Sequence, residues 1–296
     1  GAKHSMIGSI PFMVGFLVLV LMLQYYPTLS WIAAIIYGAE FAFFWMGFHI
    51  DAALNGKRKD LGKESGMISF LGILPSVVGP LLGGVILYFL SFNVLYTFVI
   101  LITLISFLPL LMSKEVYAKG KMHLGFDKRH LKYSYAYFCE GVSHISGLVF
   151  WPLFIYVILG SYLSLGWYGT FVTVIVGMFT LVIGKWSDDG KKSLLLKIFS
   201  MLTSLVWLGK IFVVGVLGVF ALGTLGNVGG YGVYVPLLAR TYRMAKKEKV
   251  SYLFFRELSL GLGRVVALLL VLVTLNFKLG FLLTSLVWLG FFFFVR

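Results

Sequence analysis

GKWSDDGKKSLLL, residues 184–196, is the most informative segment of this chain because it places a short polar join between two long apolar runs. The chain around it is 60% hydrophobic and only 12% charged, whereas about a quarter of the residues in soluble domains are charged. The join superficially resembles a phosphate-binding loop. It has one residue too many between Gly184 and Gly190, however, and a Lys where such a loop has Ser or Thr. We therefore interpret it as a connection between two membrane helices.

Apolar runs near 20 residues recur on both sides of this join, and that is about the length a helix needs to cross a bilayer. A soluble α-solenoid would need many more charges on its outward faces, and transmembrane strands would alternate in shorter segments. We expect an all-α, polytopic membrane helix bundle. Its ten predicted spans are 7–24, 31–53, 66–89, 93–112, 134–159, 165–185, 193–213, 218–240, 250–274 and 277–295.

The net charge of +14 is concentrated at every second join between these spans. The opposite joins carry only Lys210 and Lys278. This asymmetry is typical of membrane proteins, whose cytoplasmic loops are rich in Lys and Arg. It predicts an integral protein of a prokaryotic cell (inner) membrane with both ends of this chain in the cytoplasm, and it argues against nucleic acid as a partner.

Histidine and cysteine offer no metal or redox chemistry in this sequence. The five His residues are scattered without metal-ligand spacing, and the single Cys139 excludes an internal disulfide. No nucleotide-binding pattern occurs either. We expect no metal and no cofactor, and any transport must be driven by a gradient.

The two halves of the chain share weak similarity at their polar joins. Residues 189–193 (DGKKS) align with residues 1–5 (GAKHS), and residues 63–66 (KESG) align with residues 248–251 (EKVS). Each aligned segment opens a predicted span. Weak internal similarity of this kind indicates a transporter built from repeats.

The join at 184–196 resembles the Gly-x-x-x-Asp-x-x-Gly-basic-basic loop of the major facilitator superfamily, with its second Gly one residue early. Upstream, residues 57–87 resemble that family's loop between helices 4 and 5 and the Gly-Pro-x-x-Gly-Gly motif of helix 5. The signature-motif residues are Gly184, Asp188, Gly190, Lys191 and Lys192 in the loop, and Gly79, Pro80, Gly83 and Gly84 in the helix.

This resemblance identifies GAKHS as the tail of the first signature loop, so that the ten spans correspond to helices 3–12. It implies that helices 1 and 2 are absent, and we expect a fragment; a natural ten-span variant is the alternative. The expected division is a remainder of the N-terminal bundle at 1–112 (helices 3–6), a basic cytoplasmic linker at 113–133, and a six-helix C-terminal bundle at 134–296 (helices 7–12).

The superfamily's helices 4, 7 and 10 line its central cavity, and three stripes at helical spacing fall on the corresponding spans. The alternative is a closed packing interface in which these residues satisfy one another. The predicted substrate-binding residues are Tyr37, Glu40, Phe44, Tyr137, Glu140, His144, Trp151, Asn227 and Tyr231.

Ionisable groups inside a bilayer cost about 2.5 kcal/mol or more and are functional candidates. Glu140 and Glu40 are the predicted proton-coupling residues. Glu140 is four residues from His144, with which it could pair, and Pro152 interrupts the same helix. Glu257 and Arg264, seven residues apart, are predicted to form a buried structural ion pair.

Glycines in the predicted fifth and tenth helices favour close helix packing. In the superfamily the helix-5 motif is associated with exchangers, but the usual Gly four residues before Gly79 is Pro75 here. That departure weakens the inference of an antiporter.

The sequence as a whole predicts a monomeric secondary active transporter of a small solute, working by alternating access, with proton-coupled export favoured. An uptake permease for a sugar or organic acid, and a transport-inactive membrane sensor of the same fold, are the alternatives. We do not expect an enzyme, since the spans lack a clustered nucleophile and base or a metal-ligand set.

Overall fold

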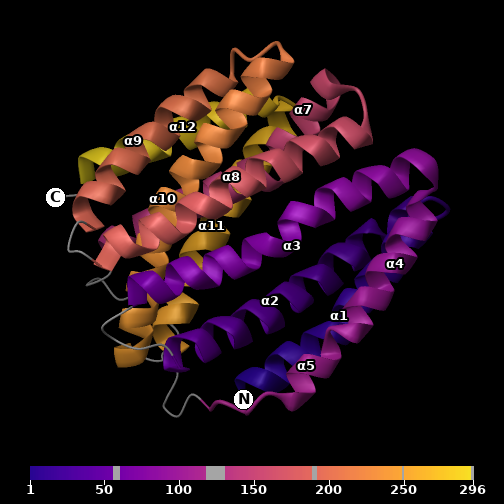
Figure 1. Ribbon diagram of the computed structural model, residues 1–296, viewed down its shortest axis with the longest axis horizontal. Helices are drawn as coiled ribbons and strands as arrows, with labels where there is room; N and C mark the ends of the chain where they lie inside the picture. The colour runs from indigo at the N-terminus through magenta and orange to yellow at the C-terminus, as the bar shows by residue number, and fades with distance from the viewer. Residues whose placement is uncertain (56–60, 118–130, 189–191, 249, 295–296) are drawn as a thin grey trace.

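The computed structural model describes residues 1–55, 61–117, 131–188, 192–248 and 250–294, and across these ranges the chain is helical with short connections (Figure 1). The N-terminal half contains α1 to α5 with one short 3-10 turn, η1. The bounds are α1 Ala2–Met22, η1 Pro27–Leu29, α2 Ser30–Asn55, α3 Leu61–Phe89, α4 Phe92–Ile105 and α5 Phe107–Met112.

The C-terminal half contains α6 to α12. Its elements are α6 Leu131–Ile145, a π-helical segment η3 Ser146–Phe150, α7 Trp151–Leu159, α8 Tyr162–Asp188, α9 Lys192–Lys210, α10 Val216–Glu248, α11 Val250–Thr274 and α12 Phe277–Phe294. The described residues include no strand, in agreement with the all-α expectation.

Nine helical stretches within the described ranges are long and apolar enough to cross a membrane. Three of them are composite, since η1 continues into α2, α4 continues into α5, and α6 continues through η3 into α7. The tenth expected span is α12, an apolar helix that is shorter than the others. The chain is an integral membrane protein with the predicted order of spans.

The expected break in the helix at residues 131–159 lies where Pro152 removes a backbone donor. Pro152 is in the first turn of α7, and the five residues before Trp151 form the π segment η3. Such wide turns within a helix are often found at functional sites. Gly160 ends α7 in the left-handed conformation, at φ 71°, where a residue without Cβ is favoured.

The helices run side by side in two groups (Figure 1). Helices α1, α2, α4 and α5 lie together, and α9 and α12 lie on the far side of the molecule. Between them, α3 packs along α8, so that this pair joins the two halves. Helices α2 and α10 make a second contact between the halves.

The glycines of the helix-5 motif divide between the two sides of α3. A Cβ on Gly84 would lie 2.7 Å from the carbonyl oxygen of Tyr162 on α8, so only Gly permits this approach. Gly79 and Gly83 have no neighbouring atom near the position of a Cβ. The expectation that these two glycines mediate close packing is therefore wrong, because they point away from α8.

Two hydrophobic clusters fill the interior. The larger is built by the C-terminal half together with Ile73 of α3. The smaller lies where α2 meets α10 and α11, and we call it the inner cluster. It consists of Ala53, Leu238, Ala239, Tyr242, Ala245 and Leu253.

Candidate functional site

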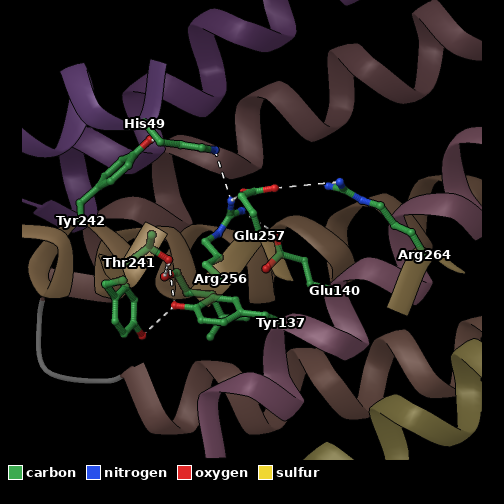
Figure 2. Close-up of polar contacts among 10 residues, drawn as sticks. His49, Tyr137, Glu140, Thr241, Tyr242, Arg256, Glu257 and Arg264 are labelled. Carbon is green, nitrogen blue, oxygen red and sulfur yellow. Dashed lines mark hydrogen bonds and ion pairs between the residues drawn. The ribbon is translucent and has the colours of Figure 1, made fainter. Parts of the chain in front are cut away.

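A buried arginine, Arg256 of α11, is the centre of a polar network between the two halves (Figure 2). Its side chain is 5% exposed. Nη2 donates to Oε1 of Glu140 on α6 at 3.1 Å, and Nη1 donates to Oε1 of Glu257 at 2.5 Å. Two carboxylates therefore compensate one buried guanidinium, the condition under which a buried cation is stable.

His49 of α2 connects this network to the N-terminal half (Figure 2). Nη1 of Arg256 lies 3.3 Å from Nε2 of His49, and Nδ1 of His49 lies 3.1 Å from the hydroxyl of Tyr242 on α10. Arginine can only donate, so Nε2 accepts and carries no proton. The neutral imidazole then holds its proton on Nδ1 and donates it to Tyr242.

Tyr137 of α6 extends the network along the C-terminal half (Figure 2). Its hydroxyl lies 2.9 Å from Oγ1 of Thr241 and 3.1 Å from the hydroxyl of Tyr252. Thr241 donates its own proton to the carbonyl of Leu237, so it accepts from Tyr137. Tyr252 in turn donates to Tyr137. These fully satisfied hydroxyls give the network a fixed geometry.

Arg264 follows Arg256 by about two turns of α11. Its Nη1 is 4.0 Å from Oε2 of Glu257, and its guanidinium lies 4.9 Å from the ring centroid of Phe41 on α2. The two predicted ion-pair partners are thus within reach of each other. The shorter contact of Glu257, however, is with its neighbour Arg256, which was not among the residues predicted for the site.

The link between the halves lies near one end of the helices. His49 precedes the end of α2 at Asn55 by six residues, and Arg256 follows the start of α11 at Val250 by six residues. Six residues of α-helix rise about 9 Å. The inner cluster packs against the same ends. Polar and apolar contacts together therefore close this end of the interface between the halves.

The three predicted residues of α2 do not join the network. Glu40 is buried and has no hydrogen bond or ion pair with another described residue. Tyr37 is partly exposed and its ring packs 4.7 Å from that of Phe16. Phe44 stacks on Phe48 at 6.1 Å. They form an aromatic surface around a buried carboxylate.

The remaining predicted residues are distributed over the C-terminal half. His144 is exposed and makes no bond to Glu140, whose partner is Arg256, so the expected pairing is absent from the described structure. Asn227 donates to the carbonyl of Gly223 in its own helix, and Tyr231 packs edge-on to Tyr234. Trp151 donates to the hydroxyl of Tyr168.

Part of the signature loop cannot be placed. Gly190 and Lys191 lie outside the described residues, and so do the side chains of Asp188 and Lys192. Gly184 is described, and its Cα lies 3.0 Å from where a Cβ on Gly66 would be. The loop therefore begins at a close contact between α3 and α8.

Sequence reasoning missed His49 and Tyr242 as site residues. The available signal was weak: a histidine and a tyrosine near the polar ends of two spans, 193 residues apart. The described residues also contain no group of three or more His, Cys, Asp or Glu that could hold a metal ion. The site is an arginine–carboxylate network, suited to holding two bundles together and to exchanging protons.

Comparison of the sequence with known proteins finds a bacterial relative. No family model matches the chain. The uncharacterized protein YqgE of Bacillus subtilis is 26% identical over 259 residues, which cover 78% of this chain. The chain spans 58% of the length of that relative.

Solved structures of transporters match the whole chain. FucP, a major facilitator superfamily transporter solved in the outward conformation, has a TM-score of 0.66 and 12% identity, with 83% of its chain covered. The human organic anion transporter MFSD10 (TETRAN) has a TM-score of 0.71 and 13% identity, with 77% of its chain covered. A second FucP structure, of a variant of the protein described as the E. coli fucose:proton symporter, has a TM-score of 0.63 and 12% identity. This chain has the fold of the major facilitator superfamily of transporters.

Proposed function

We propose that this chain is the principal part of a secondary active transporter that carries a small solute by alternating access. The observation that supports this most is the contact of Arg256 with His49, because it closes one end of the interface between the halves with groups that can separate. The placement of basic residues assigns this end to the cytoplasm. Separation of the halves at this contact, as they rock against each other, would expose a site near the middle of the bilayer.

Two-sided cysteine labelling tests this proposal without a known solute. Cys139 is replaced by Ser, and reporters are introduced separately as Ala53→Cys in the inner cluster and Tyr37→Cys near the opposite end. The structure predicts a slow reaction at position 53, since Ala53 is 1% exposed, and a fast reaction at position 37, since Tyr37 is 38% exposed. Adding Arg256→Gln should speed the first and slow the second. Unchanged rates at both positions would contradict alternating access.

Proton coupling is the finer part of the proposal, and we assign it to Glu140. Its Oε1 binds Arg256, whereas its Oε2 is buried without a hydrogen-bond partner among the described residues. A proton on Oε2 would cancel the charge that holds Arg256, and the bond from Arg256 to His49 would weaken with it. Protonation would thereby favour opening at the cytoplasmic end. Glu40, without such a partner, is assigned to solute binding.

Flux in proteoliposomes separates the two carboxylates. L-Fucose and benzoate are the first probes, because FucP is described as a fucose:proton symporter and MFSD10 as an organic anion transporter. Glu140→Gln should abolish proton-driven accumulation and leave counterflow, because Gln keeps the shape but cannot titrate. Glu40→Gln should mainly change the half-saturating concentration. Accumulation at the unmodified level in Glu140→Gln would remove Glu140 from coupling.

Proton-coupled export remains our favoured direction, with uptake of a sugar or organic acid as the alternative. Fluxes measured with the proton gradient applied in either orientation, in vesicles of known protein orientation, distinguish the two. The protein is proposed to act as a monomer.

A further inference from the structure

A second buried cation, Lys210, has surroundings quite unlike those of Arg256. The residue ends α9 and is 1% exposed. A lysine at a helix end in a membrane usually extends to the bilayer surface. From the sequence we accordingly assign Lys210 to an external join, as we do Lys278. The residue does end α9 at that join, but its side chain turns into the C-terminal half and not toward the bilayer surface.

Two indole rings enclose the ammonium group. Nζ of Lys210 lies 3.7 Å from the ring centroid of Trp207 and 4.3 Å from that of Trp151. The aromatic faces stabilise a cation, but they do not neutralise it. The ammonium of Lys210 forms no hydrogen bond or ion pair with any other described residue.

The sequence supplies no carboxylate to this region. Residues 151–187 and 192–247, which include α9 and nearly all of α8 and α10, contain no Asp or Glu. The single carboxylate on the α6–α7 span is Glu140, which is bound to Arg256. An unpaired charge in the membrane interior is costly and marks a functional site. The missing negative charge has to come from outside this part of the chain.

A second unused donor lies beside the ammonium. The hydroxyl of Tyr168 accepts a hydrogen bond from Nε1 of Trp151 at 2.6 Å. A hydroxyl can accept and donate together, and no described residue accepts the Tyr168 proton. Trp151 contacts both Tyr168 and Lys210, so the two donors lie next to one indole, the hydroxyl at its Nε1 edge and the ammonium over its face.

Glycines of α10 form one wall of this arrangement. A Cβ on Gly223 would lie close against the Tyr168 hydroxyl, and one on Gly226 would lie 3.1 Å from Nζ of Lys210. These two glycines are three residues apart and so share a face of the helix. The ammonium of Lys210 and the hydroxyl of Tyr168 therefore both approach the turn of α10 at which these two glycines present no side chain.

From this arrangement we propose that Lys210 and Tyr168 bind the carboxylate of the transported solute, with Trp151 and Trp207 as apolar walls for the rest of the molecule. The expected substrate class is a small organic monoanion with an aromatic or apolar body. This inference rests on the proposed transport function and narrows its substrate. The ammonium and the hydroxyl supply the two donors that a carboxylate accepts.

The site is closed in this conformation, since both indoles and Lys210 are buried. Trp151 directly follows the π segment η3 and precedes Pro152. Interruptions of the backbone hydrogen-bond ladder at such positions are where helices bend. Movement of α7 would uncover Lys210 and admit the solute. Because α7 belongs to the same membrane span as Glu140, solute entry and protonation would act on one span.

Equilibrium binding of benzoate to the purified full-length protein tests the site without requiring transport. Tryptophan fluorescence is the readout because two indoles contact Lys210. Sodium benzoate should change the emission saturably, whereas benzamide, its uncharged counterpart, should not. Lys210→Met should weaken the benzoate response at least tenfold. Lys278→Met is the matched control, since Lys278 is an exposed lysine of the other external join and should leave the response unchanged.

A second variant covers the case in which Lys210→Met fails to fold. Tyr168→Phe keeps the ring and removes the donor, and it should weaken benzoate binding several-fold. An equal response to benzoate and benzamide, or an unmodified response in Lys210→Met, would overturn the proposal. The proposal would also be overturned if sodium chloride gave the same fluorescence response and prevented the response to benzoate, because the site would then hold an inorganic anion. Transport failure with intact benzoate binding would count against the proposed function and leave this site standing.

Discussion

Arg256 and Lys210 are both buried cations in the C-terminal half, but the chain treats them in opposite ways. Arg256 is held by Glu140 and Glu257 and reaches His49 across the interface. Lys210 has two indole faces and no carboxylate among the described residues. A charge that the protein itself neutralises can serve as a reversible contact between bundles. A charge left without a counter-ion is suited to binding one carried by the solute.

The largest effect is expected from removing the paired cation. Arg256→Met removes the cation that Glu140 and Glu257 share, and it leaves both half-buried carboxylates without their nearest counter-ion. Breaking a buried ion pair from one side costs about 3–5 kcal/mol. Thermal unfolding in detergent should show this loss, and Arg256→Lys should recover part of it because it keeps the charge. An unfolding temperature that is unchanged in Arg256→Met would mean that the network contributes nothing to stability.

The next largest effect is expected at the connection between the halves. His49→Phe keeps a ring but removes the contacts to Arg256 and Tyr242, each worth about 1 kcal/mol or more. Since about 1.4 kcal/mol corresponds to a factor of ten, labelling of Ala53→Cys should accelerate about tenfold. His144→Phe is the matched control, as His144 is an exposed histidine of the neighbouring α6. Equal acceleration in both variants would show that the effect does not arise at His49.

A smaller effect, of opposite sign, is expected at the unpaired cation. An unpaired Lys in the membrane interior costs about 2.5–3.5 kcal/mol, and cation–π contact returns about 2 kcal/mol. Lys210→Met should therefore stabilise the protein by about 1 kcal/mol in the unfolding assay used for Arg256→Met. Destabilisation as large as that of Arg256→Met would show that Lys210 has a protein partner, and the contrast between the two sites would disappear.

The smallest effect concerns a paired but solvent-accessible charge at Glu115, after α5. Desolvation raises the pKa of this carboxyl, but hydrogen bonds from the backbone N–H groups of Lys3, His4 and Val116, together with the His4 ring, outweigh it and lower the pKa to about 2. Because the folded pKa lies below the ordinary value, the contact stabilises the start of α1 above about pH 4.3. That stabilisation is lost as the pH falls towards 2.

Hydrogen exchange of the Lys3 and His4 amides measures this contact. Protection should persist at about pH 4 and be lost as the pH falls through the carboxyl pKa of about 2, and Glu115→Gln should lower it at about pH 4. Protection that is already lost at the higher of these two pH values would show that the backbone amides do not hold the carboxylate in its ionised form.

The fold could be predicted from the sequence because each span is an apolar run that ends at a polar join, and because basic joins alternate with neutral ones. Local breaks were partly accessible. Pro152 marked the interruption of its helix, and Pro109, three residues after Ser106, is the matching signal for the break between α4 and α5, although our prediction of the span at 93–112 did not use it. The fate of Gly79 and Gly83 could not be predicted, because the motif alone does not tell which face of α3 meets α8.

The site could be predicted from the sequence only in part, for the same reason. Stripes of polar residues indicated Glu140 and Tyr137, since spacing along one helix shows which residues share a face. The partners of His49 lie 193 and 207 residues away, and single-sequence patterns carry no information on such contacts. The sequence placed Lys210 at a join between two spans, but it does not show whether the side chain faces the surface or the interior. Only packing reveals the two indoles beside it.

The most direct test of alternating closure is a pair of distances measured by double electron–electron resonance in the Cys139→Ser background. Spin labels at Asn55→Cys and Arg243→Cys report the ends of α2 and α10 nearest the inner cluster, and labels at Ser30→Cys and Val216→Cys report their opposite ends. Glu140→Gln, which mimics the protonated carboxyl, should lengthen the first distance and shorten the second. Distances that stay fixed, or that lengthen together, would contradict a gate held by Arg256 and released by a proton on Glu140.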